Sequence, residues 1–168
     1  LLESGSLERL FQAVKGEDFS HFRILSTVRK GPFGVDAINQ LLAARLRSPQ
    51  VPIMITRNDY RLGLSNGETG MLQGEWAHFP DKEPIARAAL PSFEYAYALS
   101  VHKSQGSEYK RVLFLLPPGS EVFGREVLYT GVTRARDHIE LQASEETLRN
   151  TLKNGSRKLS SVRERISS

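Results

Sequence analysis

The stretch YAYALSVHKSQGSEYKRVLFLL, residues 95–116, decides the fold class. Two apolar runs, Tyr95–Val101 and Arg111–Leu116, are rich in the aromatic and branched residues that favour β-strands. A polar segment, residues 100–109, joins them. Strands that end in a short polar connection are typical of α/β sheets, which bind ligands at their strand ends. We therefore expect an α/β domain with a candidate site in this segment.

Elements on both sides continue the alternation of helix and strand. Before it, the apolar spacing predicts a helix over residues 6–15, a strand over Phe22–Val28 and a helix from Val35 to Leu46. After it, we expect a helix over Glu126–Ala135 and a strand over His138–Gln142. A last helix begins at Ser144, where a hydroxyl can cap the first turn.

The middle of the chain lacks helical periodicity. Residues 51–93 combine short apolar runs with turn residues and prolines, which indicates a small β-rich insertion. We therefore divide the chain into an α/β domain (residues 1–50 and 94–148), an insertion (51–93) and a basic C-terminal tail (149–168). Such a tail suits nucleic-acid phosphates, but a solvated chain end is the more common explanation of the same composition.

Composition excludes several classes of protein. The 168 residues are 39% hydrophobic and 25% charged and include no cysteine, which excludes collagen, coiled coils and disulfide scaffolds. No apolar run reaches the roughly 18 residues of a membrane-spanning helix, and a cysteine-free domain suits a reducing cytoplasm. The net charge of +4 lies entirely within residues 101–168. Because the chain opens on Leu1 with no initiator methionine, we expect a fragment.

Metal and nucleophile chemistry have little support. The four histidines have no metal-ligand spacing, so we expect no metal site. Neither Gly106-Ser107-Glu108 nor Gly119-Ser120-Glu121 has the second glycine of a hydrolase nucleophile elbow.

Two segments carry side chains suited to anions. In the first, His102 and Lys103 can meet phosphate oxygens, and Gly106 permits a close approach of the backbone. In the second, the helical phase places Arg134 away from the apolar face that contains Leu128. A polar turn and a solvated arginine explain the same residues without any ligand. Local chemistry leaves both interpretations open.

Together the two segments resemble motifs of a known family. VHKSQGSEY is similar to motif V and LYTGVTRAR to motif VI of superfamily-one DNA helicases, and HKSQGSE is the form typical of the RecD family. LSTVRKGPFGVDAIN resembles the motif IV region. MITRNDYRLGLSNGETG resembles the segment that leads into the SH3-like insertion called 2B. The resemblance covers residues 22–145, with the four segments in the family's order.

The resemblance implies a fold and a set of site residues. The fold is the second RecA-like domain, 2A, interrupted by the SH3-like 2B, although the 2B stretch is short here. Arg134 corresponds to the catalytic arginine finger, with Arg29 of motif IV as a second phosphate contact. Gly106 and Glu108 correspond to residues near the nucleotide. Single-stranded DNA would contact residues of motif V and of the insertion: Ser100, His102, Lys103 and Asn66.

The resemblance also implies an activity. The parent would be a bacterial, cytoplasmic, ATP-dependent helicase that moves 5′ to 3′ on single-stranded DNA, as the α subunit of exodeoxyribonuclease V or a stand-alone relative. That enzyme acts in double-strand break repair and recombination. Its partners would be an N-terminal RecA-like domain, which supplies the phosphate loop and the Mg²⁺ ligands missing here, and RecB and RecC. The alternative is a non-catalytic nucleic-acid-binding or partner-docking module with the same fold.

Overall fold

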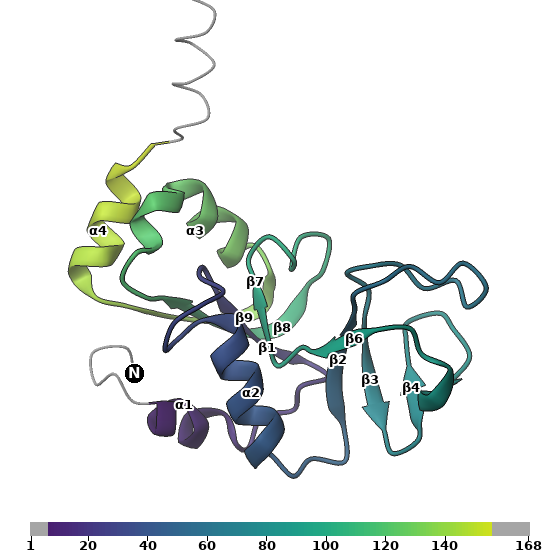
Figure 1. Cartoon of the computed structure of the whole chain (residues 1–168). Coiled ribbons are helices and arrows are strands. Elements are labelled where there is room, and N and C mark those ends of the chain that lie inside the picture. The colour runs from purple at the N-terminus through teal and green to yellow at the C-terminus, as the bar shows by residue number, and fades with distance from the viewer. Residues whose placement is uncertain (1–6, 156–168) are drawn as a thin grey trace, which may run out of the picture.

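Two β-sheets lie side by side in the computed structural model, which describes residues 7–155 (Figure 1). A four-stranded parallel sheet carries helices on both faces. A five-stranded antiparallel sheet forms a separate lobe on one side of it. The chain leaves the parallel sheet after β1 (Phe22–Ser26), forms the antiparallel sheet, and then returns to the parallel sheet with β7 (Ala98–Ser100). The antiparallel sheet is therefore an insertion in the α/β domain.

The parallel sheet has the strand order β7-β1-β8-β9. Its strands are β1 (Phe22–Ser26), β7 (Ala98–Ser100), β8 (Tyr109–Leu116) and β9 (Ala135–Ala143). All three pairings are parallel. The carboxyl ends of the four strands therefore meet at one edge of the sheet and their amino ends at the other.

Alternating residues bury both faces of this sheet. Leu113 and Leu115 face the core with α1 (Leu7–Val14) and α2 (Val35–Arg45). Phe114 and its alternate neighbours in β8 face the core with α3 (Arg125–Val132). The second face also receives α4 (Glu145–Lys153), which packs against the short helix η2 (Ser120–Phe123) and α3. A strand buried on both faces explains the continuous apolar run in the sequence.

The insertion is a meander with the strand order β5-β4-β3-β2-β6. Its strands are β2 (Val51–Ile55), β3 (Thr69–Gln73), β4 (Trp76–His78), β5 (Ile85–Ala86) and β6 (Phe93–Tyr95), with the short helix η1 (Arg87–Ala89) after β5. Its core contains Ile53, Ile55 and Phe79. Between them Met54 points the other way and joins the core of the α/β domain. The two sheets are thus packed together.

Several predicted boundaries differ from the structure. The single strand expected over Tyr95–Val101 is two strands in two different sheets, because Tyr95 pairs with Ile53 of the insertion and Ala98 pairs with Ile24. The predicted boundary between residues 93 and 94 therefore falls inside β6. The tail predicted from residue 149 begins with the second half of α4, which continues to Lys153. Residues 156–168, the rest of that tail, lie outside the described part of the chain.

The helix expected to continue to Ala135 ends at Val132. Its last turn tightens, since the N–H of Arg134 donates to the carbonyl of Gly131, three residues back. Ala135 then begins β9, opposite Tyr109. Arg134 consequently lies in the turn between α3 and β9 and not on the helix.

In the described residues, 7–155, no helix is long and apolar enough to cross a membrane.

Candidate functional site

The loop after β7 is held by its own serines. The hydroxyl of Ser100 accepts a hydrogen bond from the N–H of Lys103 at 3.1 Å. The buried Ser104 donates its hydroxyl to the carbonyl of Val101 at 2.6 Å. These bonds leave the side chains of His102 and Lys103 exposed at the outside of the loop. Ser100 was predicted to bind DNA, together with His102 and Lys103. In the structure, its hydroxyl holds the loop that exposes the other two side chains.

Gly106 and Glu108 follow in the same loop. Gly106 has a φ of +84°, which favours glycine, and a Cβ placed there would meet nothing within 4 Å. The space above its backbone is therefore open. Glu108 is exposed and forms no ion pair with any described residue. Both residues were predicted to lie near a nucleotide, and both face solvent.

Arg134 connects motif V to motif VI. Its Nη1 donates to the main-chain carbonyl of Ser107 at 3.3 Å, and its Nε donates to the carbonyl of Thr130 at 3.2 Å. Nη2 donates to the hydroxyl of Thr133 at 3.1 Å, and the N–H of Tyr109 donates to the carbonyl of Arg134 at 2.9 Å. Every one of these acceptors is neutral, and no described acidic side chain pairs with the guanidinium. The charge of this half-buried arginine is therefore unbalanced.

Arg29 has a different environment. It is exposed in the loop between β1 and α2, where its Nε lies 3.3 Å from a carboxylate oxygen of Asp36. Its Nη2 lies 3.4 Å from a carboxylate oxygen of Glu94, in β6. Two acidic groups thus already balance its charge, and the second of them belongs to the insertion.

The structure does not bring Arg29 and Arg134 together. Arg29 follows the carboxyl end of β1, whereas Arg134 immediately precedes the amino end of β9. Because the sheet is parallel, the two arginines lie at opposite edges of it. Arg134 instead lies next to motif V, through Ser107.

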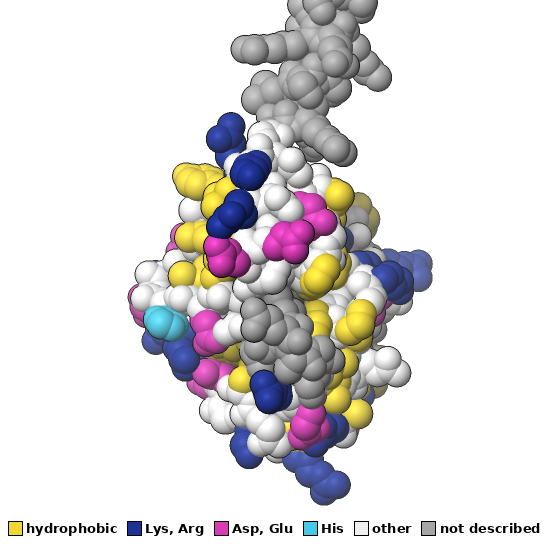
Figure 2. Space-filling view, turned by 90° about the vertical axis from the view of Figure 1, so that its left-hand side faces the viewer, with side chains coloured by type: hydrophobic (Ala, Val, Ile, Leu, Met, Phe, Trp, Pro, Cys, Tyr) yellow, Lys and Arg dark blue, Asp and Glu magenta, His cyan; other side chains and the backbone are white. Residues whose placement is uncertain are grey.

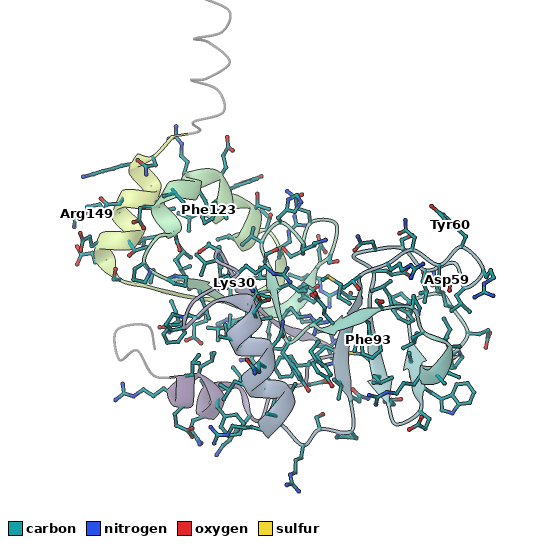
Figure 3. All side chains as sticks on the ribbon, viewed as in Figure 1. Lys30, Asp59, Tyr60, Phe93, Phe123 and Arg149 are labelled. Atoms are coloured by element: carbon teal, nitrogen blue, oxygen red, sulfur yellow. The ribbon has the colours of Figure 1, made fainter. Side chains whose placement is uncertain are left out.

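Asn66 lies in the long connection between β2 and β3. Its N–H donates to the side-chain carbonyl of Asn58 at 2.7 Å, and its own side chain is exposed. The same connection carries Asp59 and Tyr60 at the outer tip of the insertion, where Tyr60 points away from the α/β domain (Figure 3). No described contact joins Asn66 to the loop after β7, although both connections lie toward the upper side of Figure 1.

Charge is mixed on the face that carries α4 and α1. Figure 2 shows lysines and arginines among acidic and hydrophobic side chains there, without a continuous basic stripe over the described residues. Among residues 7–155, no group of three or more histidine or carboxylate side chains is placed to hold a metal ion. The exposed side chains of His102 and Lys103 in the loop after β7, the motif V loop, can bind anions and form hydrogen bonds.

Two functional features were not found from the sequence. The carbonyl of Ser107 orients Arg134, but a main-chain acceptor leaves no signal in the side-chain pattern. The second feature is Gly131. A Cβ on it would come within 2.3 Å of the Phe114 ring, so only glycine lets α3 pack this closely on β8. Its position three residues before Arg134 is the signal that sequence inspection could have used.

Comparisons with known proteins agree with this geometry. The family described as "UvrD-like helicase C-terminal domain" matches residues 95–141, which contain both the loop after β7 and Arg134. The RecBCD enzyme subunit RecD of Haemophilus influenzae is 32% identical over 141 residues, which are 76% of this chain and 22% of that protein. The ATP-dependent RecD2 DNA helicase of Deinococcus radiodurans is 33% identical over 137 residues, which are 70% of this chain and 19% of that protein.

The chain is a C-terminal helicase domain of the RecD family. It spans about a fifth of the length of these two relatives. The crystal structure of Bacteroides Pif1 bound to ssDNA matches 95% of the chain and 50% of that protein, with a TM-score of 0.56 and 13% identity, a likeness that concerns the fold alone. These comparisons confirm the predicted family, and the predicted RecA-like α/β fold with a β-rich insertion is confirmed as well. In this RecD-family domain, motif V and motif VI are joined by the contacts of Arg134 with Ser107 and Tyr109.

Proposed function

We propose that this RecD-family domain supplies the second half of the ATPase site of a helicase motor, which moves 5′ to 3′ along single-stranded DNA in the bacterial cytoplasm. The observation that carries the proposal is the unbalanced charge of Arg134, held beside the motif V loop. An N-terminal RecA-like domain of the same protein would bind most of ATP and supply the phosphate loop and Mg²⁺ ligands. RecB and RecC would be its partners if the parent is the exodeoxyribonuclease V subunit.

Arg134 has the chemistry of an arginine finger. A guanidinium stays protonated and offers planar donors to phosphoryl oxygens, so it stabilises the charge that grows during phosphoryl transfer. Its present acceptors are the neutral oxygens of Thr130, Thr133 and Ser107, which a more strongly charged phosphate would replace. Arg29 can join it only by leaving Asp36 and Glu94.

The motif V loop offers a route for coupling ATP to DNA. Its first part exposes His102 and Lys103, which can contact a DNA backbone, and its last part holds the carbonyl of Ser107 that binds Arg134. If a nucleotide draws Arg134 away from Ser107, the loop loses that bond and can change its hold on DNA. Such coupling is a shift between two states of one loop.

The test replaces Arg134 in the full-length parent. For an arginine finger, Arg134→Ala should lower kcat of the DNA-stimulated ATPase by roughly 10³ or more while ATP still binds. Arg134→Lys should restore little of the rate, because an ammonium lacks the planar fork. Arg136→Ala, which removes an exposed arginine two residues away, is the matched control and should leave kcat near the wild-type value.

A near-normal kcat in folded Arg134→Ala protein would reject the arginine finger. It would favour the alternative function, a non-catalytic nucleic-acid-binding or partner-docking module. In that case Arg134 would serve only to hold motifs V and VI together, and the substitution would lower the thermal stability without a specific effect on turnover.

A further inference from the structure

A cleft of about 500 Å³ separates the α/β domain from the insertion. From the α/β domain, β1 and the start of β8 line it. From the insertion, β3, the last residue of β4 and the two residues after it line the cleft. A cleft of this size is suited to a small organic ligand and not only to a single ion. The residues that carry the argument are Arg23, His78, Glu108 and Tyr109.

Arg23 is buried in this cleft wall with a donor that has no partner. Only 4% of the residue is exposed. Its Nη1 donates to the main-chain carbonyls of Phe19, at 2.8 Å, and Phe22, at 3.4 Å. Its Nε is buried and has no hydrogen-bond partner among the described residues, and the same is true of the Tyr109 hydroxyl. Two buried polar groups of one cleft thus have unused hydrogen-bonding capacity.

The charge of Arg23 has no acidic partner among the described residues. The guanidinium carbon lies 4.8 Å from the centre of the Tyr109 ring, which provides part of its stabilisation. Burial lowers the pKa of Arg23, and its interaction with the Tyr109 side chain opposes that shift. An arginine remains charged at neutral pH. A buried charge without a counter-ion is costly, so proteins rarely keep one unless an anion completes the site.

We propose that this cleft binds the phosphate group of a nucleotide unit, with Arg23 as its central ligand. Nε belongs to the edge of the guanidinium that binds oxyanions in a planar, two-point manner. The hydroxyl of Tyr109 lies in the same cleft and can donate to a further phosphate oxygen. Unused donors on two side chains, Arg23 and Tyr109, suit the several oxygens of a phosphate.

The surrounding charges favour a phosphodiester over a free phosphate dianion. One unpaired cation matches one negative charge, and the carboxylate of Glu108 in the same cleft opposes a second. The exposed ring of His78 lines the cleft on the insertion side and offers a surface on which a sugar or base can pack. The ligand that fits is a monoanionic backbone phosphate with its attached nucleoside.

This site is separate from the exposed face of the motif V loop, but it lies next to it. Tyr109 contacts both, since its ring faces Arg23 and its N–H binds Arg134. A nucleic-acid strand bound in the cleft would therefore contact Tyr109, whose N–H also binds the carbonyl of Arg134, the proposed arginine finger. The proposal concerns a second contact with nucleic acid and does not require that Arg134 act in catalysis.

The experiment uses the purified 168-residue chain labelled with ¹⁵N. Three probes are compared at constant ionic strength: inorganic phosphate, thymidine monophosphate and a short oligothymidylate. The readouts are the Nε–H resonance of Arg23, assigned by its loss in Arg23→Met, and the shift of the thermal midpoint on adding each probe. Arg23→Met replaces a buried unpaired charge with an apolar side chain, a change that often preserves or raises stability, so the variant should fold.

Oligothymidylate should shift the Arg23 resonance and raise the midpoint of the wild-type chain. Arg23→Met should lose that rise and bind at least about tenfold more weakly. Tyr109→Phe keeps the ring and should weaken binding by a smaller factor. Arg87→Met, which removes an exposed cation of the insertion, is the control for non-specific attraction and should resemble the wild type.

Each outcome decides the proposal. If the binding of thymidine monophosphate or phosphate depends on Arg23 and the binding of the oligonucleotide does not, the phosphate site is supported and its ligand is a free nucleotide. If every probe acts equally on the wild type and on Arg23→Met, the proposal is overturned, because phosphate stabilises any fold by exclusion from its surface. Binding of oligothymidylate that weakens in Lys103→Ala but not in Arg23→Met would overturn this site and leave the proposed helicase function intact.

Discussion

Gly131 packs so closely on Phe114 that a Cβ at residue 131 would lie 2.3 Å from the Phe114 ring. This contact sets the distance between α3 and β8. Since Arg134 follows three residues later, it also sets where the guanidinium meets the carbonyl of Ser107. The position of the proposed arginine finger thus depends on a glycine in the core of the domain.

We expect Gly131→Ala to destabilise the domain by about 1–3 kcal/mol, because overpacking forces the helix or the ring to move. Chemical denaturation of the chain measures this loss. In a Phe114→Leu background the same substitution should cost much less, since the smaller side chain leaves room for the methyl group. An equal cost in both backgrounds would show that the Phe114 contact is not the cause.

Gly106 requires a different explanation, because a Cβ there meets nothing and only its φ of +84° disfavours other residues. We expect Gly106→Ala to cost about 1–2 kcal/mol of unfolding free energy. Gly16 is the matched control: its Cβ would also meet nothing, and its φ is not in the left-handed region. Gly16→Ala should be neutral or slightly stabilising. Similar thermal midpoints for the two variants would contradict a conformational role for Gly106.

The central strands of the α/β domain and the family were predictable from the sequence for a physical reason. Strands buried on both faces give continuous apolar runs such as Val112–Leu116, and the family's motifs keep particular residues in a fixed order. The end of α3 was not predictable, since Ala135 leaves the helical pattern in order to pair with Tyr109, a residue distant in the sequence. Tertiary pairing overrode local periodicity there.

The relative placement of the site residues was also beyond the sequence. Arg29 and Arg134 both lie in motifs of one family, yet nothing in their order says that they follow opposite edges of the sheet. Arg23 was not predicted as a site residue. It is the second residue of the strand FRILS, and a charged side chain near the start of a strand is expected to be exposed. Only the structure shows that it is buried with an unused donor.

Arg29→Ala in the full-length parent should reduce kcat less than Arg134→Ala does. The guanidinium of Arg29 is already balanced by Asp36 and Glu94, and its exposed ion pairs contribute only about 0–1 kcal/mol to stability. We expect a folded variant whose ATPase is reduced by a smaller factor. Steady-state ATPase assays with saturating single-stranded DNA give the comparison. A loss as large as that of Arg134→Ala would mean that Arg29 leaves its carboxylates and reaches the phosphate.

Acid should weaken the contact between α1 and α2. Hydrogen bonds from Arg45, and then from Gln12, lower the pKa of Glu8 to about 2. Because this pKa is below its unfolded value, the stabilising contribution is complete above pH ~4.5 and is lost as the pH falls toward 2. Between these values the thermal midpoint of the wild type should decrease more than that of Glu8→Gln. Parallel curves for the two proteins would show that the ion pair with Arg45 adds nothing.

Substitution of Lys103 tests whether the motif V loop contacts a DNA backbone. If Lys103 neutralises one phosphate, Lys103→Ala should weaken the binding of oligothymidylate and reduce the salt dependence, the slope of log K against log[salt], by about 0.7. His102→Ala removes a second exposed side chain of the same loop and should also weaken binding. Arg149→Ala removes an exposed cation on α4, at the far end of the domain from the insertion (Figure 3), and serves as the control. Binding titrations of the 168-residue chain at several salt concentrations give the slopes. Equal slopes for the wild type, Lys103→Ala and Arg149→Ala would place the DNA contact elsewhere, and the cleft around Arg23 would then be the next surface to substitute.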